Sequence, residues 1–159
     1  MAAVGFEQKI CAPAAFKRRI ESLARPLVFT NGVFDILHRG HVTYLAEARA
    51  LGASLVVALN SDASVRRLGK GDDRPINTLQ DRCAVMAALE SVALVTWFEE
   101  DTPLARILEC RPDHLVKGGD WSADRIVGAA ETQAWGGRVH SIPFRHERST
   151  SALLAKIRT

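Results

Sequence analysis

The chain has 159 residues, of which 47% are apolar and 25% are charged, as expected for one globular domain with a buried core. No run of about 18 apolar residues is present, which excludes a membrane-spanning helix, and we find no signal-peptide pattern, so we expect a cytoplasmic protein. The net charge of +3 favours an anionic partner such as nucleic acid, acidic lipid or a phosphorylated metabolite.

Short apolar runs alternate with segments of helical periodicity, after a lead-in segment of residues 1–25. In chain order we expect a helix at 14–23, a strand at 27–30, a helix at 42–51, a strand at 54–60, a loop at 69–77, a helix at 78–89, a strand at 93–98, a helix at 102–110, strands at 113–119 and 136–144, and a helix at 149–157. Because the strands are apolar on both faces and separated by helices, residues 26–159 predict an α/β domain with a five-stranded parallel sheet.

The cysteines are few, odd in number and far apart in the sequence: Cys11, Cys83 and Cys110. They form no CxxC pair and no tight cluster with histidine, which excludes a disulfide framework. We expect reduced thiols, with Cys83 and Cys110 packed as apolar side chains within helices.

Three polar segments fall at the predicted carboxyl edge of the sheet, where open parallel sheets bind their ligands. "TNGVFDILHRGH" (30–41) follows the first strand, "VKGGDW" (116–121) follows the fourth, and "ERSTS" (147–151) opens the last helix. Their convergence on one edge predicts the functional site.

In the first of these segments, His38 and His41 are spaced to share one face of a helix at its N-terminus, where free backbone N–H groups favour an anion. Imidazoles add donors, and Gly40 allows a ligand to approach the backbone. This set suits phosphate oxygens. A zinc site would need more ligands than this pair provides, and the other three histidines show no matching spacing. A structural histidine pair stays open as an alternative.

The segment 30–41 resembles the G-x-F-D-x-x-H-x-G-H signature of the cytidylyltransferase-like nucleotidyltransferases, and "ERSTS" resembles their second signature. Together with "ALNSDASVRRLGKGDDRPINTLQDR", "FEEDTP" and "LVKGGDW", the chain is similar to the heptose-phosphate adenylyltransferases over residues 26–158. The resemblance implies a three-layer Rossmann-like fold. It departs from the family at Glu147 and Arg148, which stand where a glycine and an apolar residue are usual.

What the resemblance implies is adenylyl transfer from ATP to D-glycero-β-D-manno-heptose 1-phosphate by direct in-line attack, giving ADP-heptose and pyrophosphate for the inner core of lipopolysaccharide. No covalent intermediate is expected, since no Ser or Cys beside a His forms an activated nucleophile. Mg²⁺ is expected to enter with ATP, because no dedicated carboxylate cage is visible. A homodimer is expected because relatives often pair, and no nucleic-acid or membrane partner is implied.

The resemblance also assigns roles to individual residues. The catalytic candidates are His38, His41 and Lys117. The nucleotide and phosphate candidates are Thr30, Asn31, Gly32, Gly40, Arg82, Gly118, Gly119, Ser149 and Thr150. The candidates on the substrate side are Phe34, Asp35, Asp62, Arg74 and Asp120.

Several of these residues carry alternatives. Phe34 is expected to pack and Asp35 to brace its loop rather than act as a base. Ser149 also suits a helix N-cap, which is compatible with binding an anion. Asp120 contacts a sugar or caps a turn, and Trp121 stacks on a ring or packs. Lys70 and Arg74 lie in a loop that can close over substrate.

Other functions compete with this one. A glycerol-3-phosphate or phosphoalcohol cytidylyltransferase using CTP would share the same phosphate-binding residues. A nucleotide-binding module without turnover is the non-enzymatic alternative. A nucleic-acid binder is disfavoured, because the chain has no basic stripe interleaved with aromatic residues.

Overall fold

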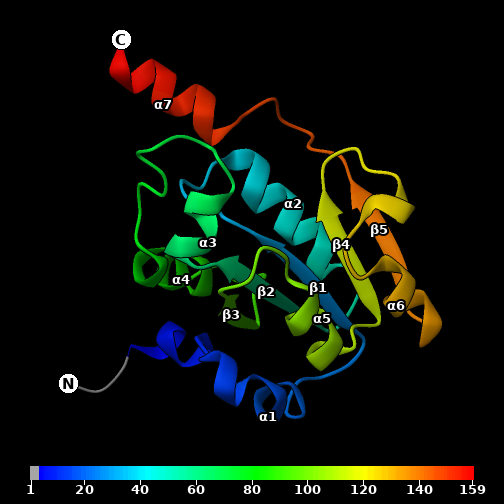
Figure 1. The fold of residues 1–159 in the computed structure, drawn as a ribbon. Coiled ribbons are helices and arrows are strands. Elements are labelled where there is room, and N and C mark those ends of the chain that lie inside the picture. The colour runs from blue at the N-terminus through cyan, green and yellow to red at the C-terminus, as the bar shows by residue number, and fades with distance from the viewer. Residues whose placement is uncertain (1–3) are drawn as a thin grey trace.

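The computed structural model describes residues 4–159 and confirms the predicted α/β fold, with a five-stranded parallel sheet in the order β3-β2-β1-β4-β5 (Figure 1). The strands are β1 (Leu27–Gly32), β2 (Ser54–Asn60), β3 (Leu94–Phe98), β4 (His114–Gly118) and β5 (Arg138–Ile142). Each strand overlaps the position predicted for it. Over the described residues, no helix is long and apolar enough to cross a bilayer.

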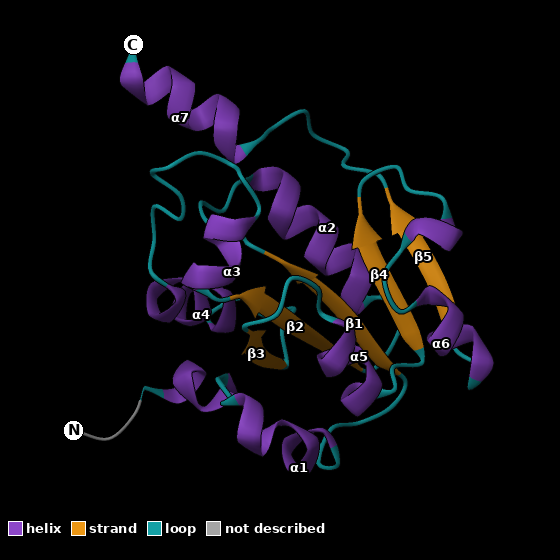
Figure 2. Ribbon diagram, in the orientation of Figure 1, coloured by secondary structure: helices purple, strands orange, loops and turns teal. Residues whose placement is uncertain are grey.

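Helices surround this sheet on both faces (Figure 2). They are η1 (Gly5–Lys9), η2 (Pro13–Ala15), α1 (Phe16–Ile20), α2 (Arg39–Arg49), α3 (Asp62–Arg67), α4 (Leu79–Ala87), α5 (Leu104–Cys110), η3 (Ala123–Arg125), α6 (Ala129–Ala134) and α7 (Thr150–Arg158). The sequence did not predict α3 or α6. Both are six residues long, too short for an apolar periodicity to show.

Successive side chains along each strand point to opposite faces of the sheet, so each face has its own core. On one face, Val28 of β1 packs in a cluster with Leu45 of α2 and Met86 of α4. On the other face, Phe29 of β1 packs in a cluster with Ile107 of α5 and with residues of α1 and α6. The helices that follow β1 and β2 therefore cover one face, and those that follow β3 and β4 cover the other.

The segment before β1 closes the edge of the sheet at β3. Ile10 forms a parallel bridge with Val95, and the Cys11 N–H donates to the Val95 carbonyl at 2.8 Å. Phe16 and Ile20 of α1 are then buried against the sheet. Residues 5–20 thus contribute to the core and occupy backbone groups that an open edge would expose.

All three cysteines are free and buried, as predicted. Burial raises the pKa of Cys83, in α4, to about 11 and that of Cys110, in α5, to about 12. Both thiols therefore stay protonated near neutral pH and act as packing groups.

The order of the strands places a crevice at the carboxyl end of β1. From β1 the chain crosses over to β2 and β3 on one side, and β4 and β5 lie on the other. The loops after β1 and β4 therefore diverge, as at the ligand-binding switch point of open α/β sheets. The helix α7 projects from this end of the molecule, beside the loop that joins α3 to α4 (Figure 1).

Candidate active site

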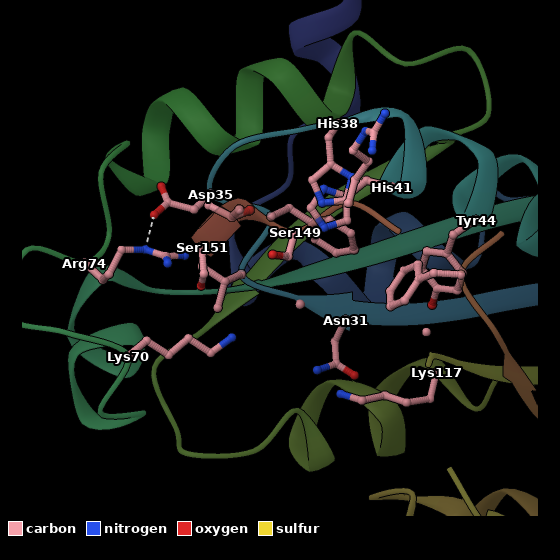
Figure 3. A pocket seen from close by; sticks show the side chains of 17 residues that line it. Asn31, Asp35, His38, His41, Tyr44, Lys70, Arg74, Lys117, Ser149 and Ser151 are labelled. Carbon is pink, nitrogen blue, oxygen red and sulfur yellow. Dashed lines mark hydrogen bonds and ion pairs between the residues drawn. The ribbon is translucent and has the colours of Figure 1, made fainter. Parts of the chain in front are cut away.

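A cavity of about 430 Å³ opens at this switch point (Figure 3). It is lined by Asn31, Gly32, Val33, Phe34, Asp35, His38, His41, Tyr44, Lys70, Arg74, Lys117, Gly118, Phe144, Arg148, Ser149, Thr150 and Ser151. The three polar segments that the sequence placed at this edge do converge here. The loop between α3 and α4 adds a fourth wall.

The loop after β1 is shaped by an aromatic ring packed over a glycine. Phe34 adopts a left-handed backbone conformation with φ of 48°, which is rare for a bulky residue. Its ring covers Gly32 so closely that a Cβ there would lie 2.8 Å from a ring carbon. Phe34 is 9% exposed, as expected of a packing residue, and its ring meets His41 edge-on at 5.2 Å between centroids.

The two signature histidines stack against each other in the cavity. His38 is the N-cap residue of α2, and its ring centroid lies 3.8 Å from that of His41 with an interplanar angle of 21°. Contrary to the prediction, Gly40 is buried beneath this pair and does not line the cavity. A Cβ on Gly40 would lie 3.0 Å from two atoms of the His38 ring. The glycine therefore makes room for an imidazole rather than for a ligand.

Both imidazoles are held in their neutral form. Burial lowers the pKa of His41 to about 4, and the neighbouring His38 acts in the same direction. Burial and the charge of Arg148 lower the pKa of His38. Within residues 4–159, the Nδ1 atom of each ring is buried without a hydrogen-bond partner.

Cations crowd the remaining walls of the cavity. Burial lowers the pKa of Lys117, and the positive charge of Lys70 lowers it further. The pKa of Lys70 is lowered in turn by burial and by Arg74. A cluster of like charges favours binding of a multiply charged anion, which relieves their repulsion.

The carboxylate of Asp35 ties the loop before α4 to the loop after β1. It accepts hydrogen bonds from Nε of Arg74 at 2.7 Å and from the N–H groups of Ile76 and Asn77 at 2.8 Å each. Burial alone would raise the pKa of Asp35, but these backbone and arginine donors bring it below its ordinary value. Asp35 therefore braces the loop as an anion, which is the arrangement expected from the sequence.

Arg82, a predicted phosphate ligand, does not line the cavity. Its side chain is fully buried and donates to the carbonyls of Val33 at 3.0 Å and Asn60 at 2.8 Å. It also donates to the carbonyl of Asn77 and forms an ion pair with Asp62 at 2.7 Å. The guanidinium thus joins the ends of β1, β2 and the loop before α4, and Asp62 serves as its counter-ion.

Of four further candidates, one lines the cavity and the others lie outside its lining. Thr30 is buried below the floor, where its hydroxyl bonds to that of Tyr44. Gly119 and Asp120 lie beyond the lining, and Asp120 is exposed. Gly118 lines the cavity, and a Cβ there would lie 2.9 Å from the ring of Phe144.

The N-terminus of α7 faces the cavity with two hydroxyl residues. Ser149 is the N-cap, and its Oγ accepts from the Ala152 N–H at 3.0 Å. Because its hydroxyl proton is not used in this bond, Ser149 keeps a donor for a ligand. The hydroxyl of Thr150 donates to the Ile36 carbonyl at 3.2 Å and so joins α7 to the loop after β1.

The sequence reasoning missed four lining residues: Val33, Tyr44, Phe144 and Ser151. Tyr44 follows His41 at helical spacing, so the periodicity of α2 carried a signal for it. Phe144 lies after β5 in a segment without periodicity, and no pattern in the sequence marked it. Within residues 4–159, no three His, Cys, Asp or Glu side chains cluster as a metal site.

Comparison with known proteins identifies relatives of this chain. The cytidylyltransferase-like family matches residues 29–154. The D-beta-D-heptose 1-phosphate adenylyltransferase of Bordetella bronchiseptica is 59% identical, with 99% of each chain covered. The bifunctional protein HldE of Hahella chejuensis is 56% identical over 83% of this chain, which spans 28% of that longer protein. A solved lipopolysaccharide core biosynthesis protein from Thermoplasma volcanium is 30% identical with a TM-score of 0.61, covering 77% of this chain and 98% of that one.

Proposed function

Because the chain belongs to the cytidylyltransferase-like family, we propose that it transfers the adenylyl group of ATP to a heptose 1-phosphate and releases pyrophosphate. The observation that carries the proposal is the stacked pair of His38 and His41 in a cavity lined with cations at the N-terminus of α7. The acceptor is proposed from the Bordetella relative, which is similar to this chain over its whole length.

The reaction needs no base on the protein. A phosphate monoester is already ionised near neutral pH, so an oxygen of the acceptor phosphate attacks the α-phosphorus of ATP directly. A bond forms between that oxygen and the α-phosphorus while the bond from the α-phosphorus to the bridging oxygen breaks. The electron pair leaves with pyrophosphate. Catalysis then consists of positioning and of stabilising negative charge spread over the phosphoryl oxygens.

The lining residues match these two requirements. The imidazoles of His38 and His41 contribute N–H donors in a partly buried site, where such bonds are stronger than in water. Lys117 and Arg148 contribute positive charge, and Ser149 contributes a hydroxyl at a helix N-terminus that favours anions. These are groups that hold a triphosphate and stabilise its transition state.

We propose that Mg²⁺ enters bound to ATP rather than to a protein cage. Asp35, which lines the cavity, and Asp62 are engaged by Arg74 and Arg82. Mg²⁺ commonly binds substrate phosphates and water with few protein ligands. When bound there, the ion would neutralise charge on the phosphates. Removing Mg²⁺ from the assay with EDTA should stop turnover. Titrating Mg²⁺ back should restore turnover in step with the MgATP concentration.

A pyrophosphate-release assay tests the proposed reaction. ATP with heptose 1-phosphate should give turnover, whereas CTP with glycerol 3-phosphate should give little. Turnover only with CTP and glycerol 3-phosphate would favour the cytidylyltransferase alternative. Tight binding of ATP by calorimetry without turnover of any acceptor would favour a nucleotide-binding module.

We also propose that the product supplies lipopolysaccharide core synthesis in the cytoplasm, in line with the description of the Thermoplasma volcanium protein. Loss of the gene product should truncate the lipopolysaccharide core, which gel electrophoresis of extracted lipopolysaccharide would show. The homodimer expected from the resemblance stays a prediction, and light scattering in solution tests it.

A further inference from the structure

A second cavity of about 200 Å³ lies beside the first and shares two of its residues, Asn31 and Lys117. Its other walls come from the loop after β3, the turn after β4, the end of η3 and the segment after it: Pro103, Trp121, Arg125, Ile126 and Val127. Figure 3 places Asn31 and Lys117 on the side of the main cavity opposite the two histidines. The shared residues therefore stand at the junction between two chambers.

We propose that this second cavity binds the polyhydroxylated ring of the acceptor, with Trp121 as its platform and with Asn31 and Arg125 as polar contacts. The inference rests on the proposed function and adds a specificity site to it. Apolar and aromatic walls with a few placed polar groups are typical of small-molecule sites. The cavity combines Trp121, Ile126 and Pro103 with three side chains that donate hydrogen bonds.

Trp121 is held in place although its side chain is exposed. Its backbone N–H donates to Oγ of Ser141 at 2.9 Å, and that hydroxyl donates to the Gly119 carbonyl at 2.5 Å. Its indole Nε1–H donates to the Gly118 carbonyl at 3.2 Å. The residue is 47% exposed. A large aromatic residue that is anchored by its backbone N–H and its indole N–H, yet left open to a cavity, is suited to pack against a ligand.

Two polar side chains face the same chamber from different directions. The Lys117 ammonium lies 5.8 Å from the centroid of the Trp121 ring, so cation and platform adjoin. Arg125 comes from η3, and within residues 4–159 its side chain has no carboxylate partner. An unpaired guanidinium in a cavity is available to donate to hydroxyl oxygens or to a phosphate.

The geometry of in-line transfer assigns the chamber to the acceptor rather than to ATP. The attacking and leaving oxygens must lie on opposite sides of the α-phosphorus. If pyrophosphate leaves toward the histidines and α7, the acceptor phosphate enters from the side of Asn31 and Lys117. The second cavity is the space beyond those two residues. At about 200 Å³ it is less than half the volume of the main cavity, which suits one sugar ring better than a whole nucleoside.

Steady-state kinetics of Trp121→Ala test the proposal. We expect KM for heptose 1-phosphate to rise about tenfold or more, equivalent to about 1.4 kcal/mol, with KM for ATP changed less than about twofold. Trp135→Phe is the matched control, because Trp135 lies at the end of α6 away from both cavities. A rise in KM for ATP with KM for the acceptor unchanged would place the nucleoside in the chamber and overturn the proposal.

Ser141 is assigned as a positioning residue, since it acts only through Trp121 and Gly119. Ser141→Ala should raise KM for the acceptor by a smaller factor than Trp121→Ala, with kcat nearly unchanged. Ser141→Thr keeps the hydroxyl and should restore KM. Equal effects of the alanine and threonine variants would contradict the role of the hydroxyl.

A binding measurement separates this inference from the proposed function. The chain has three tryptophans, so Trp97→Phe with Trp135→Phe leaves Trp121 as the only indole. Its fluorescence should change on adding heptose 1-phosphate and stay constant on adding inorganic phosphate. If catalysis occurs but this signal is absent, the inference fails and the proposed function stands. If no sugar phosphate gives turnover or a signal, both fail.

Discussion

The imidazole rings of His38 and His41 lie 3.8 Å apart, nearly parallel, with the Nδ1 atom of each buried and without a partner in the described part of the chain. Burial lowers the pKa of both rings, and for His41 the neighbouring His38 lowers it further, so both rings are neutral near neutral pH. A bound polyanion would reverse that preference. The protonation state of the pair therefore depends on pH and on the bound ligand.

This link predicts that stability falls in acid. The pKa of His41 is lowered to about 4 in the folded state, from its ordinary value of 6.5. Between these two pH values the unfolded chain binds more protons, so the free energy of unfolding should fall as the pH drops from about 7 to about 4. Urea denaturation across this range measures the effect. His41→Asn, which cannot titrate, should show a shallower dependence on pH, and an equal dependence would contradict the shift.

Removing either histidine should abolish most of the turnover. His41→Ala removes a donor that the transition state uses, and such donors are worth about a hundredfold to a thousandfold in kcat. The fold should persist, since replacing a partly exposed side chain leaves both cores intact. Pyrophosphate release measures kcat, and circular dichroism monitors the fold. Turnover near that of the wild type would refute the catalytic role of the pair.

Arg82 should matter for stability, in contrast to Arg148. Arg82→Ala leaves the carbonyls of Val33, Asn60 and Asn77 without their donor, so we expect the free energy of unfolding to fall by about 3 kcal/mol. Arg148 is exposed at the mouth of the cavity. Arg148→Ala should raise KM for ATP with little effect on stability, and urea denaturation together with kinetics separates the two. A stable Arg82→Ala protein with raised KM for ATP would restore the predicted phosphate role.

Asp35 should act on ATP binding through the loop before α4. Asp35→Asn removes the charge that pairs with Arg74 and weakens the bonds to the backbone of Ile76 and Asn77. The loop that carries Lys70 then loses its anchor, so KM for ATP should rise several-fold while kcat changes less. The matched variant Asp101→Asn alters an exposed ion pair with Arg67 and should leave both constants unchanged. Equal effects of the two variants would contradict the bracing role.

The sequence predicted the sheet and the converging loops because both depend on local patterns. Apolar runs marked all five strands, and the histidine spacing marked the start of α2. The position of Arg82 depends instead on the ends of β1 and β2 meeting the loop before α4, which no local pattern records. The prediction for the lead-in segment was incomplete for the same reason. Its short helix was expected, but its pairing with Val95 at the sheet edge depends on a contact remote in sequence.

An alanine substitution at Gly40 should separate an effect on catalysis from an effect on stability. The residue lies in the first turn of α2 without a positive φ, so alanine fits the backbone there and should favour the helix by up to about 1 kcal/mol. Its Cβ, however, would lie 3.0 Å from Cε1 and Nδ1 of His38 and 3.4 Å from the His146 carbonyl. The imidazole must then move by a few tenths of an ångström out of its stack with His41.

Gly40→Ala should therefore keep or raise the melting temperature while kcat falls by about tenfold or more, since small misplacements of catalytic groups are costly. Gly69→Ala offers a comparison with the opposite sign. A Cβ at position 69 would lie in open space, but the backbone φ there is +66°, which an L side chain rarely adopts. The variant should therefore lower stability and leave kcat nearly unchanged. Differential scanning calorimetry and pyrophosphate release measure the two effects. Full activity in Gly40→Ala would mean that the His38 ring can shift without cost, and that its stack with His41 is not required for transfer.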